Sequence, residues 1–80
     1  MEVTVYTAPT CPRCDSVKNL LDENNVEYEE KDVSNDDAYR EELMGLTGYS
    51  SVPATYIATD DGEYVVLGYN KESLSNKLGL

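Results

Sequence analysis

Alternating polar and apolar residues mark a first strand over residues 2–6, which read Glu-Val-Thr-Val-Tyr. A helix is predicted next, because four apolar side chains recur at the spacing of one helical face: Cys14, Val17, Leu20 and Leu21. The following Glu-Asn-Asn ends this helix, and residues 26–32 form a second strand. In such a strand–helix–strand unit the two strands should run parallel with a right-handed crossover.

A second helix should begin near residue 34. Ser34, with Asp37 three residues later, resembles the capping box that satisfies the first free N–H groups of a helix. Hydrophobic residues then recur at helical spacing. We expect them to form the inner face of this helix: Tyr39, Leu43 and Leu46.

Two strands and a helix complete the chain. Residues 54–59 and 63–68 are separated by a turn whose Asp-Gly pair suits a β-hairpin. Asn70 can cap a last helix that places Leu74 and Leu78 on one side. The predicted α/β order is βαβαββα, with one four-stranded mixed sheet flanked by three helices. We expect residues 1–80 to form a single domain.

Charge and composition exclude some functions. The chain has 16 acidic and 6 basic residues and no histidine, giving a net charge of −10. Because the basic residues are scattered, the chain lacks the basic stripe that nucleic-acid binding requires. It also lacks an apolar run of about 18 residues and a signal-peptide pattern. We therefore expect a cytoplasmic protein that binds neither nucleic acids nor membranes.

Both cysteines, Cys11 and Cys14, lie just after the first predicted strand, at the first turn of the first predicted helix. In the reducing cytoplasm such a pair is more often catalytic or metal-binding than a permanent cross-link. A structural zinc site needs four ligands, and one chain offers only these two cysteines and no histidine. A metal or iron–sulfur centre shared by two chains remains an alternative, in which the protein would be a carrier or sensor.

The position of the pair favours thiol–disulfide chemistry. Cys11 is the expected nucleophile, because free N–H groups and the dipole at a helix N-terminus stabilise a thiolate. Cys14, one turn inside the helix, can attack a mixed disulfide formed at Cys11. Pro12 suits the first helical position, and Arg13 either adds positive charge near the sulfurs or points to solvent. A Cys-x-x-Cys pair beside a βαβ pattern is typical of thioredoxin-like redox proteins.

Four segments together resemble the glutaredoxin family, in particular its NrdH-redoxin and glutaredoxin-like branch: VTVYTAPTCPRC, YEEKDVS, SVPATYI and VLGYNKESL. The resemblance covers essentially the whole chain. It implies a thioredoxin-like (glutaredoxin) fold and a monomeric dithiol–disulfide oxidoreductase that acts through Cys11 and Cys14. The substrate would be a protein disulfide, such as that of ribonucleotide reductase. No bound cofactor is implied beyond the redox-active Cys11–Cys14 disulfide, and no metal.

The resemblance also assigns binding residues. Pro53 resembles a proline that follows a cis peptide bond, so the Val52–Pro53 loop would face the cysteines. The backbone of Val52 would pair with an extended peptide or with glutathione. Gly68 and Tyr69 resemble the Gly-Phe turn of NrdH-redoxins and would form part of a docking surface beside the cysteines.

The resemblance leaves two reductants open, thioredoxin reductase and glutathione. Glutathione-using members generally carry a basic residue at the position matching Thr7, and a Gly-Gly turn followed by acidic residues where this chain has Gly68-Tyr69. Both departures, together with the net charge of −10, favour thioredoxin reductase. A glutathione-dependent glutaredoxin is the alternative within the same chemistry.

Overall fold

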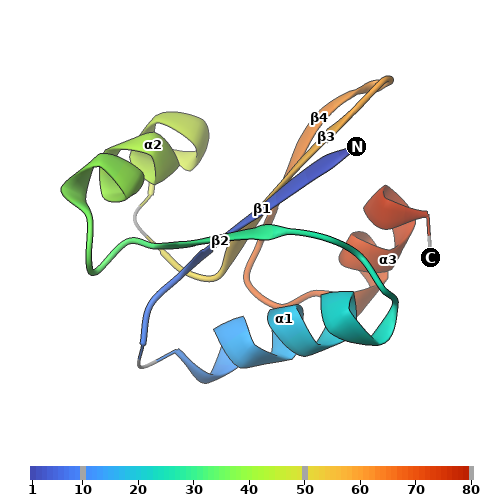
Figure 1. The fold of residues 1–80 in the computed structure, drawn as a ribbon. Helices are drawn as coiled ribbons and strands as arrows, with labels where there is room; N and C mark the ends of the chain where they lie inside the picture. Colours follow the sequence, from blue (N-terminus) through green and yellow to red (C-terminus); the bar gives the residue numbers. More distant parts are fainter. Residues whose placement is uncertain (10, 50, 80) are drawn as a thin grey trace.

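The computed structural model describes residues 1–9, 11–49 and 51–79, and its elements follow the predicted βαβαββα order (Figure 1). They are β1 (Glu2–Thr7), α1 (Pro12–Glu23), β2 (Glu29–Asp32), α2 (Asp37–Thr47), β3 (Ala54–Thr59), β4 (Gly62–Leu67) and α3 (Lys71–Leu78). The second strand is shorter than predicted, since residues 26–28 precede it as irregular chain.

The strands form one mixed sheet in the order β2-β1-β3-β4. β1 and β2 are parallel, as expected for strands joined through a helix, whereas β3 is antiparallel to both β1 and β4. The β3–β4 hairpin turns at Asp60 and Asp61, and Thr59 pairs with Gly62. Gly62 and not its neighbours has a positive φ, 145°, which explains why the turn needs a glycine there.

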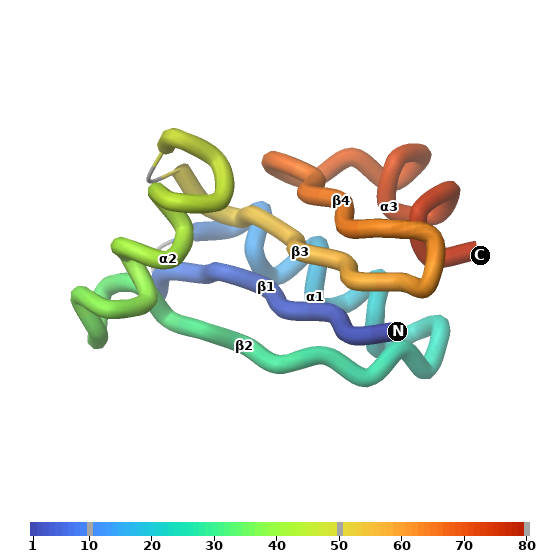
Figure 2. Tube along the Cα trace, turned by 90° about the horizontal axis from the view of Figure 1, so that it is seen from above, coloured from blue at the N-terminus to red at the C-terminus, as the bar shows by residue number. Residues whose placement is uncertain are grey.

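Helices cover both faces of the sheet. α1 and α3 lie together on one face, and α2 lies on the other, near the end at which β1 stops (Figure 1, Figure 2). Successive side chains of β1 alternate accordingly. Val3 and Val5 join the larger apolar cluster with α1 and α3, whereas Tyr6 joins a smaller cluster with Leu43 of α2. None of the helices in the described ranges is long and apolar enough to cross a membrane.

The prediction that Ser34 caps the second helix is wrong. The cap of α2 is Asp36, whose side chain accepts a hydrogen bond from the N–H of Ala38 at 2.8 Å. Ser34 instead donates through its N–H, at 2.9 Å, and its hydroxyl, at 2.6 Å, to the carboxylate of Asp32. The carboxylate at the end of β2 thus holds Ser34 in a turn outside the helix. The predicted cap of α3 is confirmed, because Asn70 accepts from the N–H of Ser73 at 3.0 Å.

The predicted inner face of α2 is only partly confirmed. Leu43 is fully buried and Tyr39 is half-buried, but Leu46 is 43% exposed. Leu46 borders an open groove beside Tyr6 and Tyr56. Because α2 covers only one end of the sheet, the apolar side chains along this helix are not all buried.

A cation reinforces the contact of α2 with the sheet. The Nζ of Lys31, in β2, lies 2.8 Å from the carboxylate of Glu42 in α2. The same atom lies 5.9 Å and 5.3 Å from the ring centres of Tyr6 and Tyr39. α2 is therefore held by one fully buried leucine together with a partly screened charge contact.

Replacing Leu43 by alanine should destabilise the protein by about 2–5 kcal/mol, because this side chain fills the smaller cluster and leaves a cavity behind. The matched substitution Leu46→Ala should change the free energy of unfolding by less than about 0.5 kcal/mol. Urea unfolding of both variants measures the difference. Equal losses would show that α2 packs on the sheet through both leucines.

Candidate functional site

The two cysteines occupy the first turn of α1. Cys11 is the N-cap residue, with extended backbone angles of φ −106° and ψ 103°, and Pro12 takes the first helical position as predicted. The N–H of Cys14 donates to the sulfur of Cys11 at 3.3 Å. The sulfur thus replaces the side-chain oxygen that usually caps a helix. This contact and the helix dipole favour negative charge on the Cys11 sulfur.

The two thiols differ in accessibility. Both are free, Cys11 is half-buried, and Cys14 is only 1% exposed. Burial raises the pKa of the Cys14 thiol to about 12, and its hydrogen bond with Cys11 adds to this shift. Interactions with the Ala8 backbone and with the positive charge of Lys18 act in the opposite direction. A reagent from solvent can therefore reach Cys11, whereas Cys14 is a neutral thiol behind it.

The two residues between the cysteines face outward. Pro12 and Arg13 are both exposed. The ion pairs found among the described residues do not include Arg13. The exposure of Arg13 is consistent with the orientation toward solvent.

The Val52–Pro53 peptide bond is cis, which confirms that prediction. Pro53 is buried, and Val52 is half-buried against the cluster of Tyr6 and Leu43. The carbonyl of Pro53 accepts from the N–H of Gly68 at 2.8 Å. The structure therefore brings together two of the segments predicted to bind substrate, and Gly68 adopts a φ of +71°, which favours glycine.

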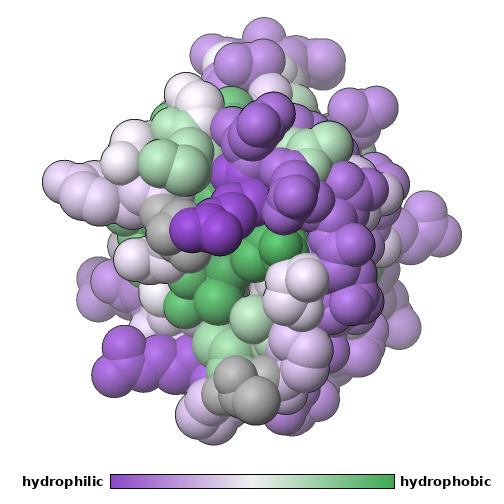
Figure 3. All heavy atoms as spheres, turned by 90° about the vertical axis from the view of Figure 1, so that its left-hand side faces the viewer, coloured by the Kyte–Doolittle hydropathy of each residue, from purple (hydrophilic) through white to green (hydrophobic). Residues whose placement is uncertain are grey.

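These segments meet the cysteines at one end of the molecule. The chain before α1 and the chain before β3 both lie at the end of the sheet marked by α2 (Figure 1, Figure 2). Seen from this end, an apolar area crosses the centre of the surface, with hydrophilic side chains around it (Figure 3). Tyr49, before the Val52–Pro53 loop, is 63% exposed, and Tyr69 is 41% exposed. Both tyrosines are available for contact with a partner.

Thr7 stands where glutathione-using members generally carry a basic residue, and its side chain is held inside the fold. Thr7 is 2% exposed, and its hydroxyl donates to Oε2 of Glu30 at 2.9 Å. Lys18 donates to the same oxygen at 3.2 Å and lies 3.6 Å from Asp15. Sequence reasoning missed this network, although Lys18 stands four residues after Cys14, at the spacing that joins neighbours on a helix.

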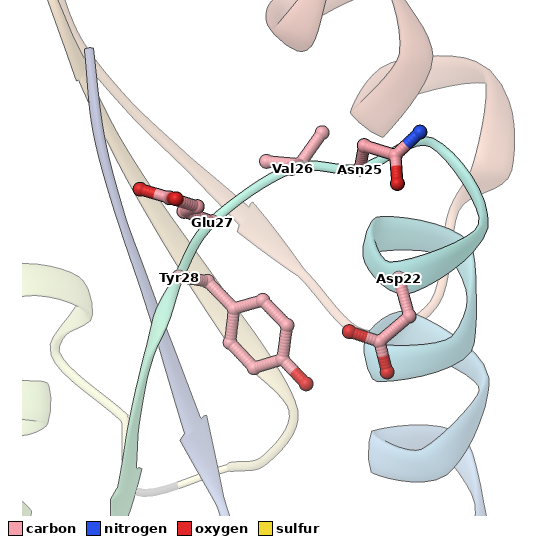
Figure 4. A pocket seen from close by; sticks show the side chains of 5 residues that line it. All are labelled: Asp22, Asn25, Val26, Glu27 and Tyr28. Atoms are coloured by element: carbon pink, nitrogen blue, oxygen red, sulfur yellow. The ribbon is translucent and has the colours of Figure 1, made fainter.

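One hollow on the surface is remote from the cysteines. About 700 Å³ in volume, it lies at the far end of α1 and is lined by Asp22, Asn25, Val26, Glu27 and Tyr28. The hydroxyl of Tyr28 points toward the Asp22 carboxylate (Figure 4), which raises the pKa of Tyr28 further after burial of the ring. This hollow has no thiol. Within the described ranges, no group of three or more His, Cys, Asp or Glu side chains could hold a metal ion.

Comparison with known proteins points to one family. The sequence model of the family described as Glutaredoxin matches residues 3–65. A glutaredoxin-like 8.6 kDa protein encoded in the rubredoxin operon of Clostridium pasteurianum is 33% identical over 72 residues, which cover 90% of this chain and 91% of that protein.

Solved structures with a similar fold include thioredoxin-like and glutaredoxin-like proteins. The crystal structure of the thioredoxin-like protein BC3987 has 44% sequence identity and a TM-score of 0.82, covering 94% of this chain and 97% of that one. NrdH-redoxin from Escherichia coli has 22% identity and a TM-score of 0.80, covering 95% and 93%, and shows a likeness of fold alone. The thioredoxin-like fold predicted from the sequence is confirmed.

The difference in accessibility can be tested by alkylation. At neutral pH, iodoacetamide should modify Cys11 and leave Cys14 intact, because Cys14 is buried and keeps its proton until the pH approaches about 12. Peptide mass mapping identifies the modified residue. In urea both residues should react, which serves as the control. Equal modification of the two cysteines in the folded protein would contradict the burial of Cys14.

Proposed function

The chain belongs to the glutaredoxin family, whose members are thiol–disulfide oxidoreductases, and we propose that it reduces protein disulfides through Cys11 and Cys14. One observation supports the assignment of this activity to Cys11 and Cys14. The N–H of Cys14 donates to the Cys11 sulfur at 3.3 Å, at the N-terminus of α1. The accessible sulfur is thereby prepared to carry the negative charge that nucleophilic attack requires.

In the first step the Cys11 thiolate attacks one sulfur of the substrate disulfide. A bond forms between Cys11 and that sulfur, the substrate S–S bond breaks, and the second substrate sulfur leaves as a thiolate that takes a proton from solvent. The half-buried position of Cys11 allows this approach, whereas the 1% exposure of Cys14 prevents the same attack there.

In the second step Cys14 loses its proton to solvent and attacks the Cys11 sulfur of the mixed disulfide. The Cys11–Cys14 bond forms, and the remaining substrate sulfur leaves as a thiolate and is protonated. The substrate has gained two electrons and the protein has lost two. A second reductant must then restore the dithiol.

Substrate contacts are proposed for the apolar area around the cysteines. The backbone of Val52 would pair with an extended segment of the substrate, as an added strand does at a sheet edge. The hydrogen bond from Gly68 to Pro53 supports this role, because it fixes the Gly68-Tyr69 turn against the Val52–Pro53 loop. Tyr69 would then supply an exposed aromatic contact beside it.

We propose thioredoxin reductase as the reductant and a protein disulfide such as that of ribonucleotide reductase as the target. Exposed Tyr49 and Tyr69 favour recognition by a protein surface. A net charge of −10 disfavours the anionic tripeptide glutathione. The glutathione-dependent alternative rests on the same two cysteines and differs only in the electron donor.

The roles of the two cysteines can be separated by substitution. Cys11→Ser should abolish disulfide reduction, because Cys14 is buried and cannot reach substrate. Cys14→Ser should attack substrate once and accumulate as a mixed disulfide. Intact mass after mixing with a disulfide-containing peptide measures both outcomes. A mixed disulfide formed by Cys11→Ser, with none in Cys14→Ser, would reverse the assigned roles.

The electron donor can be identified from NADPH consumption. The oxidised protein should be reduced rapidly by thioredoxin reductase and slowly or not at all by glutathione with glutathione reductase. Tyr69→Ala should slow the first reaction about tenfold, as loss of an aromatic interface contact does. Leu46→Ala, which removes a similarly exposed side chain from α2, is the matched control. Rapid glutathione-dependent reduction would favour the alternative donor, and an unchanged rate for Tyr69→Ala would remove this residue from the docking surface.

A further inference from the structure

The second step of the proposed function requires a negative charge on the buried sulfur of Cys14. Cys14 is 1% exposed and must become a thiolate before it can attack the mixed disulfide. At that moment the Cys11 sulfur is covalently bonded and neutral. It no longer repels charge on Cys14, nor shares a hydrogen bond with the Cys14 thiol. Burial is then the main remaining obstacle to ionisation, and it must be offset by groups around Cys14.

One cation stands in a suitable position. Lys18 is four residues after Cys14 in α1, so the two side chains are neighbours on the same side of the helix. The Nζ of Lys18 does not extend freely into solvent. It lies 3.2 Å from Oε2 of Glu30 in β2 and 3.6 Å from the carboxylate of Asp15, and the side chain is only 26% exposed.

The acceptor that holds Lys18 is itself fixed. Glu30 pairs with Val5 across the β1–β2 ladder, so its side chain lies on the sheet face that α1 covers. The hydroxyl of Thr7, from the same face of β1, donates to Oε2 of Glu30 at 2.9 Å. Thr7 is buried and cannot turn to solvent. The network therefore links the sheet to the helical turn that carries Cys14.

We propose that Lys18 is a positioning residue that stabilises the Cys14 thiolate during resolution of the mixed disulfide, and that Glu30 and Thr7 hold its ammonium group in place. This inference rests on the proposed function. Lys18 itself touches neither substrate nor the reacting sulfurs in the proposed mechanism. It acts as a fixed charge near the buried thiol.

The other ionisable groups on this side of the molecule cannot stabilise a thiolate at Cys14 by positive charge. They are Cys11 and Asp15 from α1 and Glu30 and Asp32 from β2, which are neutral or negative. Arg13 is exposed, and the ion pairs found among the described residues do not fix its guanidinium group. Without Lys18, the carboxylates of Asp15 and Glu30 would disfavour a third negative charge, on Cys14.

Lys18 remains protonated throughout the reaction. Its hydrogen bond to Glu30, and the negative charges of Glu30 and Asp15, raise the pKa of Lys18 above its ordinary value. It therefore does not accept the Cys14 proton, which passes to solvent. The same positive charge lowers the pKa of Cys14, against the larger effect of burial.

A two-phase reaction isolates this step. The reduced protein is mixed with dithiobis(nitrobenzoic acid), which releases one coloured thiolate when Cys11 attacks and a second when Cys14 displaces the remaining one. In Lys18→Gln the first phase should keep its rate, while the second phase should slow about tenfold at neutral pH, as expected for the loss of one nearby charge. Lys18→Arg should restore the second phase. Arg40→Gln, which removes one positive charge from the exposed side of α2, is the matched control.

The pH dependence distinguishes charge from structure. If Lys18 acts by its charge, Lys18→Gln should move the rise of the second-phase rate to higher pH, because Cys14 then needs a higher pH to lose its proton. A second phase that is equally fast at neutral pH in the two proteins, or one that Lys18→Arg does not restore, would overturn the proposal. Absence of the first phase in the wild type would instead overturn the proposed function, so the two failures are distinguishable.

Discussion

The hydrogen bond from the Cys14 N–H to the Cys11 sulfur is the contact on which the candidate site depends. The first N–H groups of any helix need an acceptor, and here a thiol sulfur takes the place that an oxygen usually occupies. The same backbone geometry that begins α1 therefore also prepares one sulfur for negative charge. It also places the Cys14 sulfur one turn inside the helix, where burial raises the pKa of the thiol and keeps it neutral.

The rest of the fold positions this turn. Val17 and Leu21 of α1 pack on the sheet face formed by Val3 and Val5, so the helix has a fixed orientation above β1. The antiparallel pairing of β1 with β3 places Ala54 beside Tyr6, and hence the preceding Val52–Pro53 loop at the same end as the cysteines. Gly68 then joins this loop through its hydrogen bond to Pro53. Strand register thus gathers three segments that are distant in the sequence.

Local patterns predicted much of this arrangement. The cysteines beside a strand–helix boundary and the Asn70 cap are each indicated by a few adjacent residues, whereas the cis bond before Pro53 was expected from the resemblance to the glutaredoxin family. The choice between two candidate N-cap residues of α2 was harder to predict. Both Ser34 and Asp36 can cap a helix, and Asp36 does so because the Asp32 carboxylate binds Ser34.

Other features depend on the spatial arrangement of distant segments. The exposure of Leu46 follows from how far α2 extends over the sheet, and the burial of Thr7 from its position beneath α1. The network that joins Thr7, Glu30 and Lys18 requires the parallel pairing of β1 with β2, which brings together residues far apart in the chain. No local pattern contains that information.

We propose above all that Cys11 and Cys14 of a single chain exchange two electrons with a disulfide. Peptide mapping of the wild-type protein after reaction with one equivalent of a disulfide-containing peptide tests it most directly. We expect that the protein loses two hydrogen atoms and yields one peptide with an internal Cys11–Cys14 bond, while the substrate is recovered as two thiols. An unchanged protein mass, or a disulfide that joins two protein chains, would contradict it.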